Sequence, residues 1–151
     1  MLKIQKYSER EPMSVEEQES VVNFLFRSLE EYGDPKEDIN KCINYALNKL
    51  YDDRKTGGMV LVATIDEKNV GTVILNETGM GGYIPENILV YIATDPNYRG
   101  KGIGKGLMKA AIDSVNGDIA LHVEPENPAK GLYESLGFTN KYLEMRFKKT
   151  K

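Results

Sequence analysis

An apolar run that leads into a glycine-rich basic loop is the feature that most constrains this chain. Residues 88–93 read Ile-Leu-Val-Tyr-Ile-Ala, which predicts a central strand covered on both faces. Asp95-Pro96 closes the run, and residues 99–104, Arg-Gly-Lys-Gly-Ile-Gly, open a segment with helical periodicity. A strand, a glycine-rich loop and a helix in this order indicate an anion site at the start of the helix.

The loop has the composition of a phosphate-binding site. Its glycines permit sharp turns and leave backbone N–H groups uncovered, while its basic side chains add positive charge. The helix that follows directs the positive end of its dipole toward the same place. Glycines also cluster in ordinary turns, so the loop alone does not decide between the two interpretations. The residues concerned are Arg99, Gly100, Lys101, Gly102, Ile103, Gly104 and Lys105.

Two familiar phosphate loops are excluded by spacing. A dinucleotide-binding fingerprint needs a third glycine three residues after the second, where this chain has Lys105 or Leu107. A nucleoside triphosphate loop needs Ser or Thr after Gly-Lys, and here glycine follows both Gly-Lys pairs. The anion is therefore bound by a different kind of loop.

Length and composition limit the class of protein. The 151 residues predict a single domain over 1–151. The net charge is −3 and no stretch clusters enough Lys and Arg to follow a nucleic-acid backbone, so no nucleic-acid partner is expected. No apolar run reaches the roughly 20 residues that a membrane span needs. One cysteine and a charged N-terminus without an apolar core predict a cytoplasmic protein.

The N-terminal third predicts a strand and two helices. Residues 2–4 alternate like the start of a strand, and Ser14 with Glu17 has the spacing of a capping box. Gly33 is placed to end the first helix. Asp34 followed by proline predicts a cap for a second helix, whose apolar stripe continues to Leu50.

The remaining elements complete an α/β fold with a mixed β-sheet. The first strands form an antiparallel hairpin, a strand–helix–strand crossover makes a central parallel pair, and helices flank the sheet. A short helix starts near Asn127, and a final strand is expected. The expected strands are 59–65, 70–75, 88–93, 119–123 and 142–147, and the expected crossover helix runs from Ile103 to Val115.

Two separated motifs resemble the GCN5-related N-acetyltransferase (GNAT) family. Residues 99–104 fit its Q/R-x-x-G-x-G/A loop without a mismatch. Residues 127–138, from Asn127 through Ala129 and Tyr133 to Gly137-Phe138, look like its N-x-x-A-x-x-x-Y-x-x-x-G-F segment. The N-terminal third is similar to the family only in the order of its elements.

The resemblance implies that an acetyl group moves from acetyl-coenzyme A to a primary amine by direct attack in a ternary complex. It places the pyrophosphate on residues 99–104 and splays the central parallel pair, so that Ile92, Ala93 and Thr94 bond the pantetheine arm. One of these N–H groups would also stabilise the oxyanion that forms during attack. Asn127 is implied to cap its helix and to contact the same arm, and no metal is expected.

Tyr133 is implied to be the general acid that protonates the departing thiolate of coenzyme A. Since Tyr133 lies four residues after Ala129, the two share a helix face on which the small alanine leaves room for a ligand. A tyrosine that only packs its ring against the sheet is the alternative interpretation. The complete motif favours the acid.

The group that removes the proton from the amine is less defined by the sequence. Glu86 stands just before the central strand, where some relatives carry a basic glutamate, although a solvated carboxylate at a strand end is the more ordinary interpretation. His122 is the single histidine and has a suitable pKa, but lies on the strand face opposite Leu121 and Val123. Cys42 belongs to an apolar helix stripe and is expected to be buried.

The acceptor amine is the least constrained part of the hypothesis. Residues 9–40 contain ten Asp or Glu against three Lys or Arg, which would attract a cationic amine or would simply be a solvated helix face. The acceptor is expected to be a small molecule or a peptide, and a homodimer is compatible with the family. A non-catalytic acyl-CoA-binding sensor and a longer acyl donor remain the alternatives.

Overall fold

The computed structural model describes residues 1–49 and 57–150. These residues form two compact units, Met1–Leu121 and His122–Lys151. The expectation of a single domain over 1–151 stays a prediction. Leu50, expected at the end of an apolar helix stripe, lies outside the described residues.

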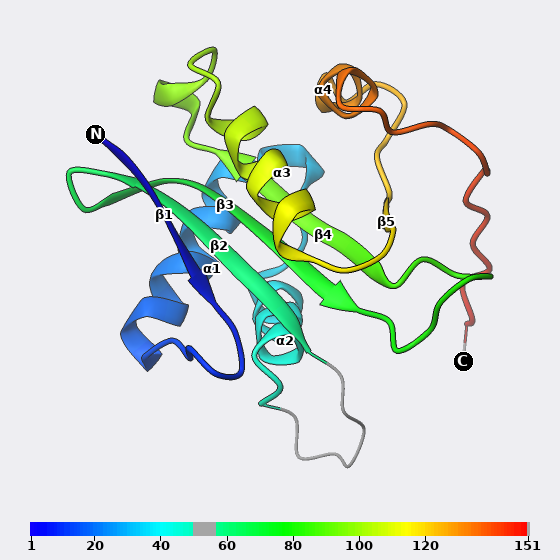
Figure 1. Cartoon of the computed structure of the whole chain (residues 1–151), viewed down its shortest axis with the longest axis horizontal. Helices are drawn as coiled ribbons and strands as arrows, with labels where there is room; N and C mark the ends of the chain where they lie inside the picture. The colour runs from blue at the N-terminus through cyan, green and yellow to red at the C-terminus, as the bar shows by residue number, and fades with distance from the viewer. Residues whose placement is uncertain (50–56, 151) are drawn as a thin grey trace. The chain divides into compact units, whose positions relative to one another are not determined.

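The first unit is built on a five-stranded mixed sheet with the strands in sequence order. Successive strands from β1 to β4 pair antiparallel, and β4 pairs with β5 in parallel. This arrangement confirms the predicted α/β class, with antiparallel N-terminal strands and a parallel pair (Figure 1). The pair was expected at the centre of the sheet, but among the described strands it lies at one end of the order, because no described strand pairs with the far side of β5. The strands are β1 (Leu2–Tyr7), β2 (Gly58–Ile65), β3 (Lys68–Glu77), β4 (Asn87–Thr94) and β5 (Ile119–Leu121).

Helices cover both faces of this sheet (Figure 1). One face packs against α1 and α2, whose side chains share a buried cluster with β2, β3 and β4. The other face packs against α3, which approaches β3 so closely that a Cβ at Gly71 would lie 2.8 Å from Leu107. The helices of this unit are α1 (Val15–Leu29), the 3₁₀ turn η1 (Glu30–Tyr32), α2 (Lys36–Ala46), the 3₁₀ turn η2 (Pro96–Tyr98) and α3 (Ile103–Ser114).

The first helix begins with the predicted capping box. The Glu17 N–H donates to Ser14 Oγ at 3.1 Å, and the Ser14 N–H donates to Glu17 Oε1 at 2.8 Å. These bonds satisfy donors that have no partner within the helix. The prediction that Gly33 ends this helix is wrong, because Glu30 leaves the helical conformation with φ of 55° and α1 ends at Leu29. Gly33 instead caps the 3₁₀ turn that follows.

The start of the second helix differs from the prediction. Pro35, rather than Asp34, occupies the cap position, and no side chain caps α2. Pro35 has ψ of 149°, so helical geometry begins only at Lys36. The Asp34 carboxylate instead accepts a hydrogen bond from Tyr91 Oη of β4. The carboxylate that was predicted to cap α2 is therefore bonded to the phenol of Tyr91, which lies far away in the sequence.

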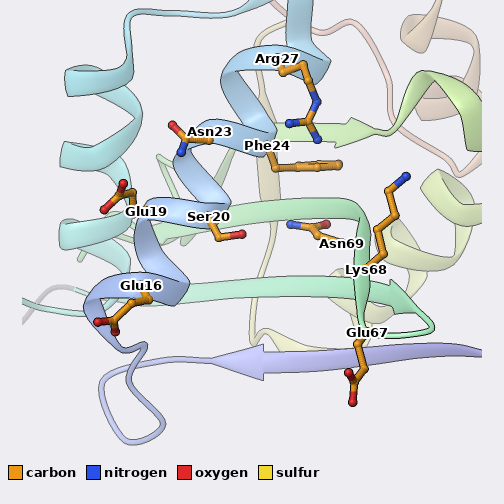
Figure 2. A pocket seen from close by; sticks show the side chains of 9 residues that line it. All are labelled: Glu16, Glu19, Ser20, Asn23, Phe24, Arg27, Glu67, Lys68 and Asn69. Atoms are coloured by element: carbon orange, nitrogen blue, oxygen red, sulfur yellow. The ribbon is translucent and has the colours of Figure 1, made fainter.

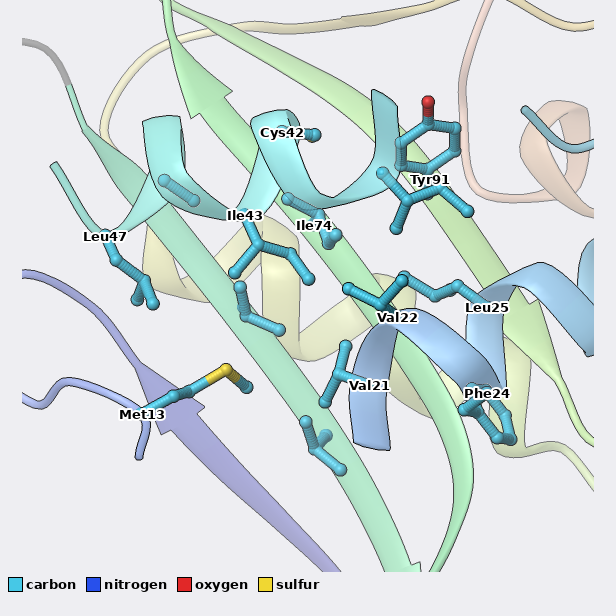
Figure 3. Close-up of a cluster of buried hydrophobic side chains, with 14 of the residues drawn as sticks. Met13, Val21, Val22, Phe24, Leu25, Cys42, Ile43, Leu47, Ile74 and Tyr91 are labelled. Atoms are coloured by element: carbon cyan, nitrogen blue, oxygen red, sulfur yellow. The ribbon is translucent and has the colours of Figure 1, made fainter. Parts of the chain in front are cut away.

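The core of the unit lies between the two N-terminal helices and the sheet (Figure 3). Leu25 of α1, Ile43 of α2 and Ile74 of β3 are completely buried there. Burial of each such side chain contributes about 2 kcal/mol to folding. This packing fixes α1 and α2 on one side of β4.

An irregularity in β4 changes the direction of its side chains. Tyr91 pairs with Ile74 and Leu89 pairs with Leu75, so Val90 is an extra residue in the ladder. Cross-strand partners share a face, and one inserted residue reverses the alternation. Tyr91 consequently belongs to the cluster under α1 and α2, whereas Leu89 lies on the face of α3.

Two expected strands differ in the structure. β5 ends at Leu121 instead of residue 123, because its pairing with β4 stops where the β4 irregularity begins. No strand forms over residues 142–147, which have no pairing partner among the described residues. Their large apolar side chains are exposed, including Leu143 and Phe147. The second unit contains α4 (Ala129–Ser135), close to the predicted position.

Ser14→Ala should destabilise the protein by about 1 kcal/mol, because it removes the acceptor for the Glu17 N–H. The free energy of unfolding from urea titration measures this change. Ser20→Ala is the matched control, since Ser20 is exposed in the middle of α1 and alanine favours helix there. Equal effects of the two substitutions would contradict a capping role for Ser14.

Candidate functional site

The parallel pair opens before β4 ends. β5 pairs only with residues 87–89 of β4, while β4 continues to Thr94. From Val90 onward one edge of β4 has no neighbouring strand among the described residues. Five residues at about 3.3 Å each make this open edge roughly 13 Å long between its first and last Cα atoms.

The open edge presents backbone groups of alternate residues. The Asp95 N–H donates to Val70 O of β3 at 2.9 Å, so Asp95 faces β3. Backbone groups alternate in direction along a strand, which turns those of Ala93 toward β3 and those of Ile92 and Thr94 toward the open edge. Of the three predicted pantetheine contacts, two therefore have backbone groups available to a ligand at this edge.

The glycine-rich loop follows directly from this edge. The buried Asp95 accepts the Asn97 N–H at 2.9 Å and so begins the η2 turn. Gly100 and Gly102 then have φ of 78° and 79°, a conformation that side-chain-bearing residues rarely adopt. No atom lies within 4 Å of a Cβ placed at either glycine, so the loop surface is open.

The loop ends at the N-terminus of α3, where backbone donors are free of side-chain caps. Gly102 occupies the cap position without a side-chain hydrogen bond, and the first helical bond runs from the Gly106 N–H to Gly102 O at 3.0 Å. The N–H groups of Ile103, Gly104 and Lys105 precede that bond and have no acceptor within the helix. Together with the helix dipole, they make an anion-binding surface.

The guanidinium of Arg99 is engaged elsewhere. It donates to Ser28 O at 3.2 Å and to Glu30 Oε1 at 3.3 Å, at the end of α1. This side chain ties the loop to α1, so its positive charge is partly neutralised by Glu30. Arg99 remains in the loop through its backbone.

Two lysines lie beside the loop on a shared aromatic ring. Lys68 Nζ and Lys101 Nζ each lie 5.2 Å from the centre of the Tyr98 ring. Lys68 Nζ also lies 3.8 Å from Asp95 Oδ2. Sequence reasoning missed Lys68, because it belongs to the start of β3 and only the sheet register brings it to the loop.

Glu86 has a structural contact in this unit. Its Oε1 accepts the Asp118 N–H at 2.9 Å, and this hydrogen bond lowers the pKa of the carboxyl. Gly117, at φ of 86°, leaves room for the Glu86 side chain, where a Cβ would overlap it. A carboxylate with a lowered pKa is a weaker base, which favours the strand-end interpretation of Glu86.

The second unit holds the other predicted residues. Asn127 Oδ1 accepts the Ala129 N–H at 2.9 Å and supports the first turn of α4. Tyr133 is buried and lies 6.0 Å from the Phe138 ring, and burial raises the pKa of its phenol to about 12. The phenol therefore stays protonated at neutral pH, as a proton donor must.

Two other candidates have properties that disfavour catalysis. His122 is exposed and follows β5 instead of lying within it. Cys42 is buried in α2, and burial raises the pKa of its thiol to about 12. A thiol with that pKa supplies almost no thiolate at neutral pH, so it is not an acyl-accepting nucleophile.

A hollow of about 560 Å³ lies between α1 and the turn from β2 to β3 (Figure 2). It contains both signs of charge, and buried Asn69 Nδ2 has no hydrogen-bond partner among the described residues. None of the predicted site residues lines it. The lining residues are Glu16, Glu19, Ser20, Asn23, Phe24, Arg27, Glu67, Lys68 and Asn69.

The described residues contain neither a metal-binding cluster nor a membrane-spanning helix. Over residues 1–49 and 57–150, no group of three or more His, Cys, Asp or Glu side chains is placed to hold a metal ion. In the same part of the chain, no helix has the length and apolarity to cross a membrane.

The open parallel pair and the uncapped loop lie within a stretch that matches a known domain family. A family model described as an acetyltransferase (GNAT) domain matches residues 56–140. The match spans more than half of the chain, and the chain belongs to the GNAT acetyltransferase family. It is an N-acetyltransferase by class. A search of curated proteins gave no match.

Solved structures share the fold. A GNAT family acetyltransferase from Streptococcus pneumoniae superposes with TM-score 0.72 and 20% identity over 100% of both chains. The ribosomal-protein-S18-alanine N-acetyltransferase of Escherichia coli gives 0.69 and 19%, over 94% of this chain and 80% of that one. An aminoglycoside acetyltransferase from an uncultured soil metagenomic sample, in complex with sisomicin, gives 0.63 and 19%, over 99% and 96%.

Gly102→Ala should weaken acetyl-CoA binding roughly tenfold, because an alanine at φ of 79° is strained by about 1 kcal/mol or more and shifts the loop. Gly106→Ala is the matched control, since its Cβ meets no atom within 4 Å and lies inside α3. It should stabilise the helix and leave binding unchanged. Calorimetric titration with acetyl-CoA measures the affinity of each variant. Equal affinities of Gly102→Ala and Gly106→Ala would contradict the assignment of residues 99–105 as the binding loop.

Proposed function

We propose that this chain transfers the acetyl group of acetyl-CoA to a primary amine by direct attack in a ternary complex. The observation that carries the proposal is the continuity of the open β4 edge with the uncapped N-terminus of α3. Polar backbone groups line the edge, and a loop without Cβ atoms at two turning points joins it to the anion-binding surface. A ligand with an amide-bearing arm and a pyrophosphate matches this sequence of groups.

The residues present fit that donor. The N–H groups of Ile103, Gly104 and Lys105 bind the pyrophosphate, supported by the charge of Lys101. The open-edge groups of Ile92 and Thr94 bind the pantetheine amides, and Asn127 adds a polar contact to the same arm. When bound, acetyl-CoA supplies an acetyl thioester. One open-edge N–H donates to the thioester oxygen and stabilises the negative charge that develops there during attack.

Tyr133 holds the proton that the departing sulfur needs. Its pKa of about 12 keeps the phenol protonated at neutral pH. The desolvation that raises the pKa of the phenol also raises the pKa of a thiolate in the same surroundings, so the two groups remain matched for proton transfer. Tyr133 Oη thus donates its proton to the sulfur as the C–S bond breaks, while the attacking nitrogen releases its proton to solvent, from which Tyr133 is reprotonated.

The acceptor is an amine of a small molecule or a peptide. Two of the similar structures are named for their substrates, a ribosomal-protein alanine and an aminoglycoside. Both substrate classes present amino groups, which agrees with amine transfer on this fold. Glu86 is given no role as the base, because its carboxylate accepts a hydrogen bond from the Asp118 N–H and has a lowered pKa.

The activity is tested by coenzyme A release from acetyl-CoA across polyamines, aminoglycosides, amino acids and short peptides. Release that depends on one amine class supports the proposal. Release with none of them, from protein that binds acetyl-CoA, would favour the non-catalytic sensor.

Tyr133→Phe should lower kcat by about 100-fold, because proton donation to the leaving group contributes roughly that much, while acetyl-CoA affinity should stay unchanged. Tyr142→Phe is the matched control, since Tyr142 is exposed in the same unit. Steady-state kinetics and calorimetry measure the two effects. An unchanged kcat in Tyr133→Phe would remove Tyr133 from the mechanism.

A further inference from the structure

A short hydrogen bond joins the central strand to the turn before α2. Tyr91 Oη donates to Asp34 Oδ2 at 2.5 Å, across 57 positions of sequence. This length is typical of a hydroxyl bonded to an ionised carboxylate. Burial and the adjacent Asp34 carboxylate both raise the pKa of Tyr91, so the phenol stays protonated and keeps donating.

Tyr91 and Asp34 lie beside the start of the open edge of β4. β5 stops pairing at Leu89, and Tyr91 follows the extra residue Val90 that turns it toward α1 and α2. A pantetheine arm that runs along this edge from the phosphate loop reaches its end beside Tyr91. The phosphate loop continues into α3 on the other face of the sheet. Tyr91 is buried on the face that α1 and α2 cover, while its partner Asp34 is exposed and can be reached by an acceptor.

The Asp34 carboxylate accepts a hydrogen bond from Tyr91 but has no cationic partner among the described residues. It caps no helix, and no Lys or Arg among the described residues forms an ion pair with it. Glu30, Asp38 and Asp95, in contrast, each lie within 4.0 Å of a Lys or Arg nitrogen. Asp34 is exposed while its orienting partner Tyr91 is buried, which gives an oriented anion open to solvent.

We propose that Asp34, oriented by Tyr91, binds a second cationic group of the acceptor amine. The inference rests on the proposed acetyl transfer and assigns an acceptor class to it. The attacking nitrogen must be neutral, and a carboxylate next to it would raise its pKa and keep it charged. The cation that Asp34 binds is therefore a different amino group of the same molecule. The acceptor is a compound with at least two amino groups.

This assignment selects Asp34 from the acidic residues between positions 9 and 40. Glu17 is used in the capping box and Glu30 pairs with Arg99, so neither offers a free charge. Glu16 lines the hollow of Figure 2, where Arg27 and Lys68 oppose a cationic ligand. Asp34, in contrast, is hydrogen-bonded to Tyr91 of β4, beside the start of the open edge.

The test compares 1,4-diaminobutane with butylamine as acceptors for the wild type, Asp34→Asn and Asp38→Asn. Asp34→Asn should raise KM for the diamine roughly tenfold, as expected for loss of a charged hydrogen bond, with kcat nearly unchanged. Its KM for butylamine should not change. Asp38→Asn is the matched control, because Asp38 lies one turn further along α2, pairs with Lys41 and does not bond Tyr91.

Tyr91→Phe should show a smaller rise in KM for the diamine, since the carboxylate is retained but no longer oriented. Calorimetric titration of the diamine into protein saturated with coenzyme A gives the same comparison without turnover. An equal change for both amines, or a lower melting temperature with both KM values unchanged, would assign the pair to stability and overturn the inference. Wild-type protein inactive with every amine would overturn the proposed function and this inference together.

Discussion

The candidate site depends on one constraint, which is that β4 loses a neighbour halfway along its length. Its first three residues pair with β5 and the rest do not, because the extra residue Val90 breaks the alternation of backbone groups. The same irregularity opens a polar strand edge and turns Tyr91 to the helix-covered face. A single inserted position thus underlies both the open edge that we propose for the donor and the orientation of Tyr91, on which the proposed acceptor side depends.

Helical and sheet packing hold this edge in place without covering it. α1 and α2 bury one face of the sheet and α3 the other, so β4 is fixed by apolar contacts on both sides. Arg99 ties the phosphate loop to the end of α1. The donors at the edge and at α3 are consequently arranged before a ligand arrives, which is how backbone groups stabilise developing charge at little reorganisation cost.

The features that depend on local chemistry could be predicted from the sequence. The glycine loop, the capping box at Ser14 and the parallel pair follow from residue type and spacing. The cap role given to Asp34 was wrong, because Tyr91 comes from a strand 57 positions away and competes for the carboxylate. The irregularity at Val90 has no local signature, and the expected strand over residues 142–147 required a pairing partner that the described residues do not supply.

Amide hydrogen exchange by NMR, with and without acetyl-CoA, tests the central claim most directly. The open-edge amides of Ile92 and Thr94 and the first-turn amides at residues 103–105 have no strand or helix partner in the described part of the chain, so they should exchange rapidly in the free protein. Acetyl-CoA should slow exchange at both sets together. Slowed exchange confined to the hollow of Figure 2, or unchanged exchange along the β4 edge in protein that binds the donor, would contradict this account.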